Sequence, residues 1–152
     1  MELNKIHKVY FLGIGGIGMS ALARFFKNIG KEVAGYDKTP TELTERLIAE
    51  GISITFEDSL DTMMINPDLL VFTPAIPKNH LQFNEYKDKG FRLYKRAEVL
   101  GLIANSMFNI SIGGSHGKTS TSSITAHIFK NSGENVAAFL GGIAVNYQSN
   151  FL

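Results

Sequence analysis

The segment VYFLGIGGIGMS, residues 9–20, is the most informative stretch of the sequence. Four apolar residues predict a buried strand, a glycine-rich turn follows, and apolar residues at three- and four-residue spacing then predict an amphipathic helix. In a turn of this type, Gly13 permits the sharp change of direction, Gly15 lets the backbone approach a diphosphate, and Gly18 lets helix and strand pack closely. The segment therefore predicts a strand–turn–helix unit that binds a diphosphate at the helix N-terminus.

A second glycine-rich turn, GGSHGKT at residues 113–119, lies about a hundred residues further along the chain. Strict Walker A spacing would need a glycine where the chain has Ile112, five positions before Gly117, so the loop is a shorter variant. Lys118 can reach the β and γ oxygens of a nucleoside triphosphate, and Thr119 can ligate magnesium. Two nucleotide sites on one chain predict a reaction in which one nucleotide is consumed to modify the other.

Short apolar segments alternate with helical patterns along the chain, which is typical of βαβ units in a parallel sheet. The strands expected before residue 105 are 9–12, 32–36, 52–56, 68–73 and 91–94. We expect an α/β fold, a Rossmann-like parallel sheet with helices on both faces, followed by the first βαβ unit of a P-loop ATPase domain.

The strand–helix pattern restarts after residue 105. We expect residues 1–105 to form a nucleotide-binding domain and residues 106–152 to be the truncated start of a second, ATP-binding domain. In the second part, a strand at 108–112, a helix at 119–130 and a strand at 136–140 are expected. One such unit cannot cover both faces of a parallel sheet. Its apolar strands are therefore expected to pack on the first domain or to pair with another copy in a homo-oligomer.

Composition limits the function classes. The chain has 152 residues, 44% hydrophobic and 19% charged, as in a soluble globular protein. A net charge of +1 without a lysine or arginine cluster argues against nucleic acid as a partner. The absence of cysteine excludes a disulfide framework and argues against structural zinc. The N-terminus lacks the apolar run of a signal peptide and no stretch has membrane-spanning length, so no membrane partner and a cytoplasmic location are expected.

Two further residues are candidates at the first turn. Asp37 lies 19 residues beyond Gly18, at the end of a predicted strand, where a carboxylate can accept hydrogen bonds from a ribose. A solvated acid at a strand end is an equally ordinary interpretation. Thr73 ends another predicted strand and could contact a uridine or a sugar. From the residues alone, this turn fits NAD as readily as another nucleotide diphosphate.

The remaining polar candidates carry weaker signals. His116 lies within the second loop, where it could contact phosphate or a substrate carboxylate, or could simply be solvated. We interpret Arg96 and Glu98 as a surface ion pair. The other histidines show no ligand spacing and are interpreted as surface or packing residues: His7, His80 and His127.

Four segments together carry a resemblance to a known family. They are GIGGIGMS at 13–20, YKRAEVL at 94–100, GSHGKT at 114–119 and FLGG at 139–142. In this order they resemble the Mur ligases of peptidoglycan synthesis, and among these the ligases that add L-alanine. The chain departs from the family pattern at Ser115 and Ser120, where threonine is usual, and both changes keep a hydroxyl.

The resemblance implies an ATP-dependent enzyme that joins L-alanine to UDP-N-acetylmuramic acid through an acyl phosphate. It implies that the UDP-sugar is bound by Gly13, Gly15, Gly16, Ile17, Gly18, Asp37 and Thr73. It implies that ATP is bound by Gly114, Ser115, His116, Gly117, Lys118, Thr119 and Ser120. Lys118 would be catalytic and Thr119 a magnesium ligand. Because family members have three domains, we expect this chain to be an N-terminal fragment that is inactive alone.

Other interpretations remain open at the level of sequence. An NAD-binding oxidoreductase, or a nucleotide-sensing module built on the first domain, leaves Lys118 and its loop without a role. The related murein tripeptide ligase shares both loops, although its first turn typically departs from Gly-Ile-Gly-Gly.

Overall fold

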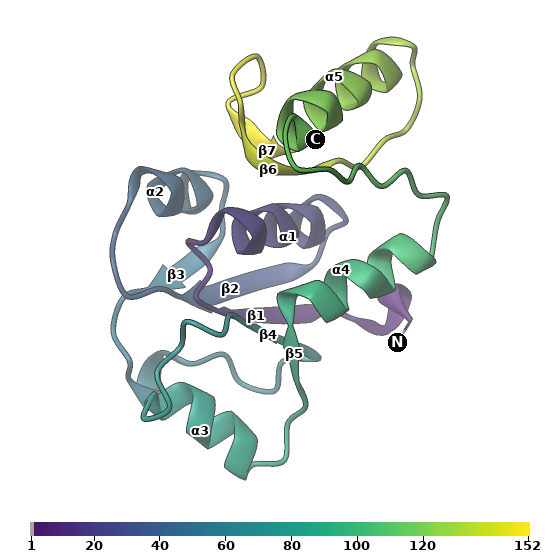
Figure 1. Ribbon diagram of the computed structural model, residues 1–152. Helices are drawn as coiled ribbons and strands as arrows, with labels where there is room; N and C mark the ends of the chain where they lie inside the picture. The colour runs from purple at the N-terminus through teal and green to yellow at the C-terminus, as the bar shows by residue number, and fades with distance from the viewer. Residues whose placement is uncertain (1) are drawn as a thin grey trace.

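The computed structural model describes residues 2–152, and its first part contains a parallel sheet of five strands (Figure 1). The strands are β1 (Lys8–Leu12), β2 (Glu32–Tyr36), β3 (Ser53–Thr55), β4 (Leu69–Phe72) and β5 (Leu93–Lys95). Their order across the sheet is β3-β2-β1-β4-β5, so the direction of winding reverses between β1 and β4. Ligands of open α/β sheets bind beside the carboxyl ends of the strands at such a reversal. The predicted α/β fold with a Rossmann-like sheet is confirmed.

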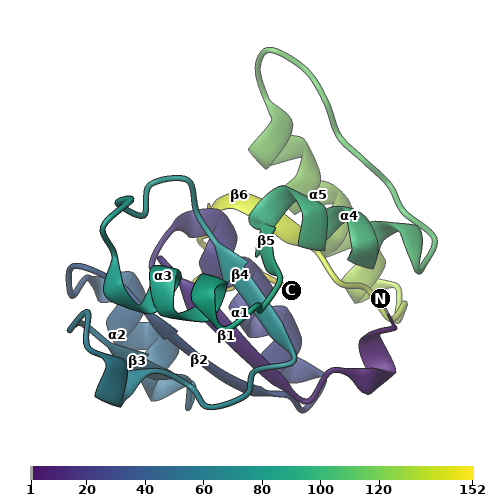
Figure 2. The same ribbon diagram turned by 90° about the horizontal axis from the view of Figure 1, so that it is seen from below.

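Helices lie on both faces of this sheet. On one face are α1 (Ile17–Asn28), α2 (Glu42–Ala49) and α4 (Arg96–Asn105), and on the other is α3 (Leu81–Asp88), seen in front of the strands in Figure 2. Two short 3-10 turns, Leu3–Lys5 and Leu60–Thr62, complete this part. No helix within residues 2–152 is both long and apolar enough to cross a membrane.

The side chains of β1 alternate between two cores. Val9 and Phe11 pack into the core that includes α1, whereas Tyr10 and Leu12 pack on the opposite side with Tyr86 of α3. All five side chains are at most 1% exposed. Burying a large apolar side chain contributes about 1.5–3 kcal/mol, so this central strand anchors the glycine turn that follows it.

The second part of the chain contains α5 (Lys118–Asn131), β6 (Phe139–Ala144) and β7 (Ser149–Phe151). The predicted strand at 136–140 begins later and continues through the paired glycines at 141 and 142. It pairs antiparallel with β7 in a hairpin. The predicted βαβ unit is wrong here, because among residues 2–152 β6 pairs with β7 and with no parallel strand before α5.

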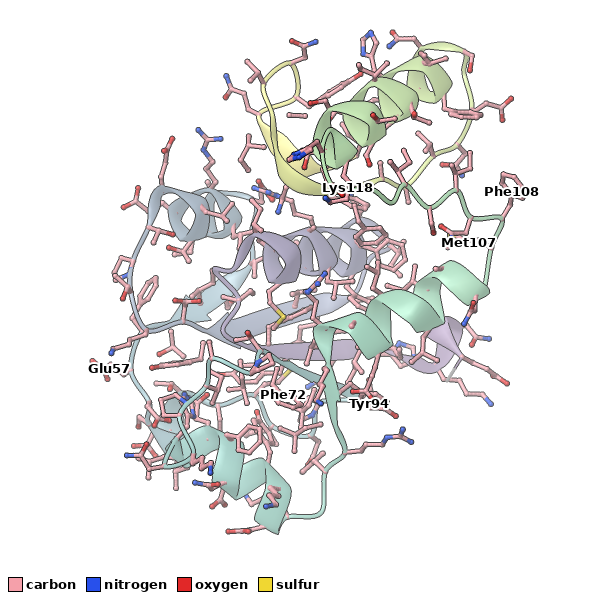
Figure 3. All side chains as sticks on the ribbon, viewed as in Figure 1. Glu57, Phe72, Tyr94, Met107, Phe108 and Lys118 are labelled. Carbon is pink, nitrogen blue, oxygen red and sulfur yellow. The ribbon has the colours of Figure 1, made fainter. Side chains whose placement is uncertain are left out.

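The predicted strand at 108–112 is also absent from the sheets of residues 2–152. Phe108 is 91% exposed and Ile110 51% exposed (Figure 3). A strand needs a neighbour that exchanges main-chain hydrogen bonds with it, and within residues 2–152 no other segment pairs with this one. Residues 108–112 are therefore coil, because apolar side chains without a pairing partner do not make a strand.

The β6–β7 hairpin packs on α1. The ring centroid of Phe25 on α1 lies 5.5 Å from the ring centroid of Phe139 and 6.0 Å from that of Phe151. Residues 106–117, between α4 and α5, contain no helix or strand. The two parts therefore touch through an aromatic contact, while the domain division at residue 105 stays a prediction.

Candidate nucleotide-binding sites

The first glycine turn is held by the end of the neighbouring strand. The carbonyl oxygen of Tyr36 accepts hydrogen bonds from the amides of Gly13 at 2.8 Å and Ile14 at 3.0 Å. Gly13 has a φ of +87°, and a Cβ there would lie 2.3 Å from Cγ2 of Thr73. A side chain at this position would be strained and would also displace Thr73. The turn and Thr73 thus form a closely packed corner at the carboxyl edge of the sheet.

Asp37 holds the same turn from the other side. Its Oδ2 accepts a hydrogen bond of 2.7 Å from the amide of Gly15, and its Oδ1 accepts one of 3.3 Å from Thr39. A Cβ on Gly15 would approach Asp37 Oδ2 to 2.8 Å and Cγ2 of Thr44 to 2.9 Å. Asp37 therefore orients the glycine turn. Because a carboxylate oxygen has more than one lone pair, Asp37 can still accept a hydrogen bond from a hydroxyl group.

Arg96 lies over the beginning of α1, which corrects the interpretation of Arg96 and Glu98 as an ion pair. Glu98 instead accepts a hydrogen bond of 2.6 Å from the amide of Lys95. A Cβ on Gly18 would lie 2.8–3.0 Å from Cδ, Nε and Nη1 of Arg96. Arg96 forms no ion pair among residues 2–152. The guanidinium thus faces the turn and not Glu98.

A cavity of about 260 Å³ connects the two parts of the chain. Its lining comes from α1, α4 and β6: Ile17, Gly18, Ala21, Leu22, Arg96, Leu100, Phe139, Leu140 and Gly141. A Cβ on Gly141 would lie 3.2 Å from Oγ1 of Thr119, at the start of α5. The cavity therefore touches the first glycine turn on one side and, through Gly141, the first turn of α5 on the other.

The second glycine turn is exposed throughout. Residues 113–120 all lie on the surface, and Lys118 folds back onto its own loop (Figure 3). Its Nζ donates to the carbonyl oxygen of Gly114 at 2.6 Å and to that of Ser115 at 3.3 Å. Gly117 has a φ of +76° and directly precedes α5. The ammonium group is therefore bonded to the main chain of its own loop, and a phosphate group bound there would compete for it.

The described residues supply only part of the ligand set that a magnesium ion needs. Within residues 2–152, no group of three or more histidine, cysteine, aspartate or glutamate residues could hold a metal ion. The hydroxyl of Thr119 is the ligand that the loop offers. A Mg²⁺ ion commonly keeps waters and phosphate oxygens as its other ligands, so the residue fits an ion that arrives with a triphosphate.

His80 packs against Tyr36, whose carbonyl oxygen holds the first turn, although its sequence context gave no such signal. The ring is buried, lies 4.5 Å from the ring of Tyr36 in an edge-on arrangement, and caps α3 by accepting from the amide of Phe83. Burial lowers the pKa of the imidazole, and the nearby carboxylate of Asp58 opposes this shift. The interpretation of His80 as a packing residue therefore agrees with its burial.

The predicted residues thus form two groups. The first gathers at the carboxyl edge of the sheet: Gly13, Gly15, Gly16, Ile17, Gly18, Asp37 and Thr73. The second, residues 114–120, forms the exposed loop and the first turn of α5. Sequence reasoning placed Arg96 in a surface ion pair and missed its position over Gly18, which depends on a contact between α4 and α1 that no local spacing reveals.

Comparison with known proteins agrees with the fold. The model of the Mur ligase family, catalytic domain, matches residues 8–107. A UDP-N-acetylmuramate–L-alanine ligase from Flavobacterium psychrophilum is 53% identical over 156 aligned residues, which cover 100% of this chain and 35% of that protein. The crystal structure of UDP-N-acetylmuramate–alanine ligase from Thermotoga maritima has a TM-score of 0.84 at 31% identity, covering 95% of this chain and 34% of that one.

A murein peptide ligase from Psychrobacter arcticus has the same TM-score, 0.84, at 24% identity, covering 97% of this chain and 33% of that one. At this identity the likeness shows the fold alone. The chain spans about a third of the length of the curated relative it matches. The family model covers more than half of the chain, and the Flavobacterium protein is 53% identical over all of it, so the chain belongs to the Mur ligase family.

Proposed function

We propose that these 152 residues are the N-terminal part of an ATP-dependent ligase that joins L-alanine to the carboxylate of UDP-N-acetylmuramic acid. The observation that carries the proposal is the cavity lined by Gly18 of the first turn and by Gly141, where an added Cβ would lie 3.2 Å from Oγ1 of Thr119 in the second. One substrate held at the first turn would extend through this cavity toward a triphosphate at the second.

The first turn would hold the UDP end of the sugar nucleotide. The main-chain amides of residues 16–18 lie at the N-terminus of α1, where the helix dipole favours the negative charge of a diphosphate. Oδ1 of Asp37 would accept a hydrogen bond from a ribose hydroxyl, and Thr73 would lie beside the uridine. Oδ2 of Asp37 keeps its hydrogen bond to Gly15, so one side chain would serve both the turn and the ligand.

The second turn would bind the phosphates of ATP. Lys118 would leave the carbonyl oxygens of Gly114 and Ser115 and neutralise the β and γ oxygens instead. The remaining residues of 114–120 would provide main-chain amides and hydroxyls. Magnesium held beside Thr119 would supply positive charge that offsets charge developing during phosphoryl transfer.

The chemistry requires activation of the muramic carboxylate. A carboxylate is a poor electrophile until one oxygen becomes a good leaving group, so the γ-phosphoryl group of ATP would be transferred to it with release of ADP. The amine of L-alanine would then attack the acyl phosphate carbon, and the tetrahedral intermediate would expel inorganic phosphate. In this scheme the chain's own residues bind and orient the two nucleotides and neutralise the charge on their phosphates.

We also propose that the chain does not form the amide bond alone, since it spans 35% of the length of its Flavobacterium relative. We place the reaction in the cytoplasm, with small-molecule partners and no nucleic acid or membrane. Self-association through residues 106–152 stays a prediction, and the exposed Phe108, Ile124 and Ile128 on that part would be the side chains involved. Light scattering that finds a strict monomer would contradict it.

Isothermal titration calorimetry of the wild-type chain tests the function. UDP and UDP-N-acetylmuramic acid are expected to bind with one site each, whereas NADH is expected to give no saturable heat. Binding of NADH in place of UDP would contradict the proposal and favour an oxidoreductase or a nucleotide sensor. Alanine-dependent phosphate release by the 152-residue chain would contradict its inactivity alone.

A further inference from the structure

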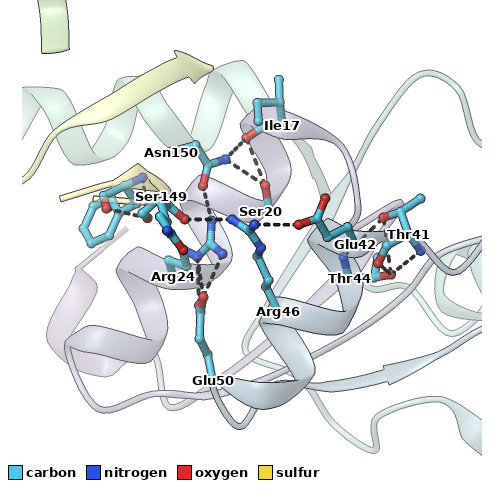
Figure 4. Close-up of polar contacts among 12 residues, drawn as sticks. Ile17, Ser20, Arg24, Thr41, Glu42, Thr44, Arg46, Glu50, Ser149 and Asn150 are labelled. Carbon is cyan, nitrogen blue, oxygen red and sulfur yellow. Dashed lines mark hydrogen bonds and ion pairs between the residues drawn. The ribbon is translucent and has the colours of Figure 1, made fainter. Parts of the chain in front are cut away.

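Asn150, on β7, reaches from the second part of the chain into the first turn of α1 (Figure 4). Its side chain is fully buried. The amide nitrogen Nδ2 donates to the carbonyl oxygen of Ile17 and, at 2.8 Å, to Oγ of Ser20. The amide oxygen Oδ1 accepts from Nη1 of Arg24. One side chain therefore uses both its donor and its acceptor against α1.

Arg24 links this contact to α2. Its guanidinium is 5% exposed, and it donates from Nε to Oε2 of Glu50 at 2.8 Å and from Nη2 to Oε1 of Glu50 at 2.7 Å. Glu50 directly follows Ala49, the last residue of α2, and is the C-cap of that helix. A buried guanidinium is costly unless its N–H groups are bonded, and here Glu50 and Asn150 together occupy three of its nitrogen atoms.

The aromatic contact of the hairpin does not fix the position of the first turn of α1. Phe139 and Phe151 pack on Phe25, but burial of apolar area is non-directional and tolerates small shifts of the hairpin. Hydrogen bonds from Asn150 depend on distance and angle. The aromatic rings therefore hold the hairpin on α1, while Asn150 fixes where the first turn of α1 lies.

That turn is where the diphosphate would bind. Ile17 is the first residue of α1, and the amides of residues 16–18 would meet the phosphate oxygens. Binding groups must be held within about 0.5 Å of their productive geometry to be effective. A contact to the carbonyl oxygen of Ile17 therefore acts directly on the orientation of the proposed cradle.

We propose that Asn150 is a positioning residue for the diphosphate cradle at Gly15–Gly18, acting through Ile17 and not through contact with the ligand. The inference rests on the proposed function for the identity of the ligand. It adds that residues 106–152 take part in the first site, since β7 supplies the side chain that orients it.

Asn150→Asp separates positioning from stability. The carboxylate keeps the shape of asparagine and the acceptor for Arg24, so the hairpin stays docked. It has no N–H for the carbonyl oxygen of Ile17, so the first turn loses its partner. Asn150→Leu, an apolar side chain of similar size, removes both functions. Asn146→Asp makes the same chemical change in the exposed turn of the hairpin and is the control.

Two readouts on the 152-residue chain decide the matter, each after circular dichroism has established that the variants are folded. By calorimetry, UDP affinity is expected to fall about tenfold in Asn150→Asp and at least as much in Asn150→Leu, and to stay within about twofold in Asn146→Asp. By amide hydrogen exchange without ligand, protection of the Ser20 amide, which bonds to Gly16, is expected to fall about tenfold in both Asn150 variants.

The outcomes are distinguishable. Unchanged exchange at Ser20 overturns the proposal whether or not UDP binds. Changed exchange with unchanged UDP affinity also overturns it, because Asn150 then orders the helix without serving the cradle. If the wild-type chain binds no UDP, the proposed function fails, and the inference that rests on it falls as well.

Discussion

The two glycine turns have similar sequences but opposite surroundings. The first follows β1, is bonded through Gly13 to the end of β2, and leads into α1, where every residue from Met19 to Phe26 is buried. The second follows an extended coil and leads into α5, where, of the residues the structure describes, Ala126 alone is buried. The first turn is therefore held in place by the elements around it, and the second lacks packing of this kind.

The two turns also differ in the polar contacts that hold them. At the first turn, the neighbouring strand supplies Asp37 to hold the amide of Gly15. At the second, the ammonium of Lys118 is bonded to the carbonyl oxygen of Gly114 within the same loop. A turn braced by other elements presents its amides at no further conformational cost, whereas a self-bonded loop must exchange its internal contacts for the ligand.

Core truncations should show the largest contrast between the two parts. Phe11→Ala removes a fully buried ring from β1 and is expected to lower the free energy of unfolding by about 3–5 kcal/mol. Phe108→Ala is the matched control, because that ring is 91% exposed. Its effect should stay within about 0.5 kcal/mol. Urea denaturation followed by circular dichroism measures both, and equal effects would contradict the difference in packing.

Adding a methyl group to each turn should give the next largest effect. Gly15→Ala would push against Asp37 and Thr44 and is expected to cost about 1–3 kcal/mol of stability and to weaken UDP binding. Gly113→Ala should change stability by less than about 0.5 kcal/mol, because its Cβ would meet nothing within 4 Å among the described residues. The same denaturation experiment measures both variants. A neutral Gly15→Ala would show that the first turn is not closely braced.

Removing the charge of Lys118 should lower the affinity for a nucleoside triphosphate and leave the affinity for UDP unchanged. Lys118→Met is expected to weaken binding of a magnesium complex of a non-hydrolysable ATP analogue about tenfold, through loss of a charge-assisted contact to phosphate. UDP affinity should remain unchanged. Lys130→Met, at the far end of α5, is the control. Calorimetry with each ligand measures the effects, and a parallel loss of UDP affinity would mean that the two turns do not form separate sites.

The smallest expected effect concerns His80, whose ring packs against Tyr36. Burial lowers its pKa, so below about pH 6.5 the unfolded chain binds a proton that the folded chain resists. The stability contributed by neutral His80 is therefore fully present above about pH 6.5 and is lost as the pH falls toward the lowered pKa of the folded state. His80→Asn keeps a helix-capping side chain and removes this titration. Urea midpoints at about pH 7.5 and 5.5 should differ less in the variant than in the wild type, and equal differences would contradict the lowered pKa.

Local patterns predicted the first part of the chain well. The strand before Gly13, the strand that ends at Tyr36 and the helix after the first turn all follow from short-range periodicity. Two errors came from the second part. The apolar segment 108–112 looks like a strand but has no partner among residues 2–152, and β6 continues through the glycines at 141 and 142 to form a hairpin.

The polar contacts between the two parts could not be predicted from the sequence. Asn150 and Ile17 are 133 positions apart, and nothing in the sequence around either indicates the other. Arg96 and Gly18 likewise meet only because α4 lies beside α1. Such contacts depend on how elements pack, which short-range spacing does not encode. The site residues inferred from the two motifs remain predictions until a ligand is bound.

Amide chemical-shift mapping tests the proposed cradle most directly. A ¹⁵N-labelled wild-type chain titrated with UDP is expected to show its largest saturable shifts at the amides of residues 13–18, Asp37 and Thr73, with small changes across residues 113–120. Saturation by NADH at the same amides without any response to UDP, or UDP shifts centred on the lysine loop, would contradict the account.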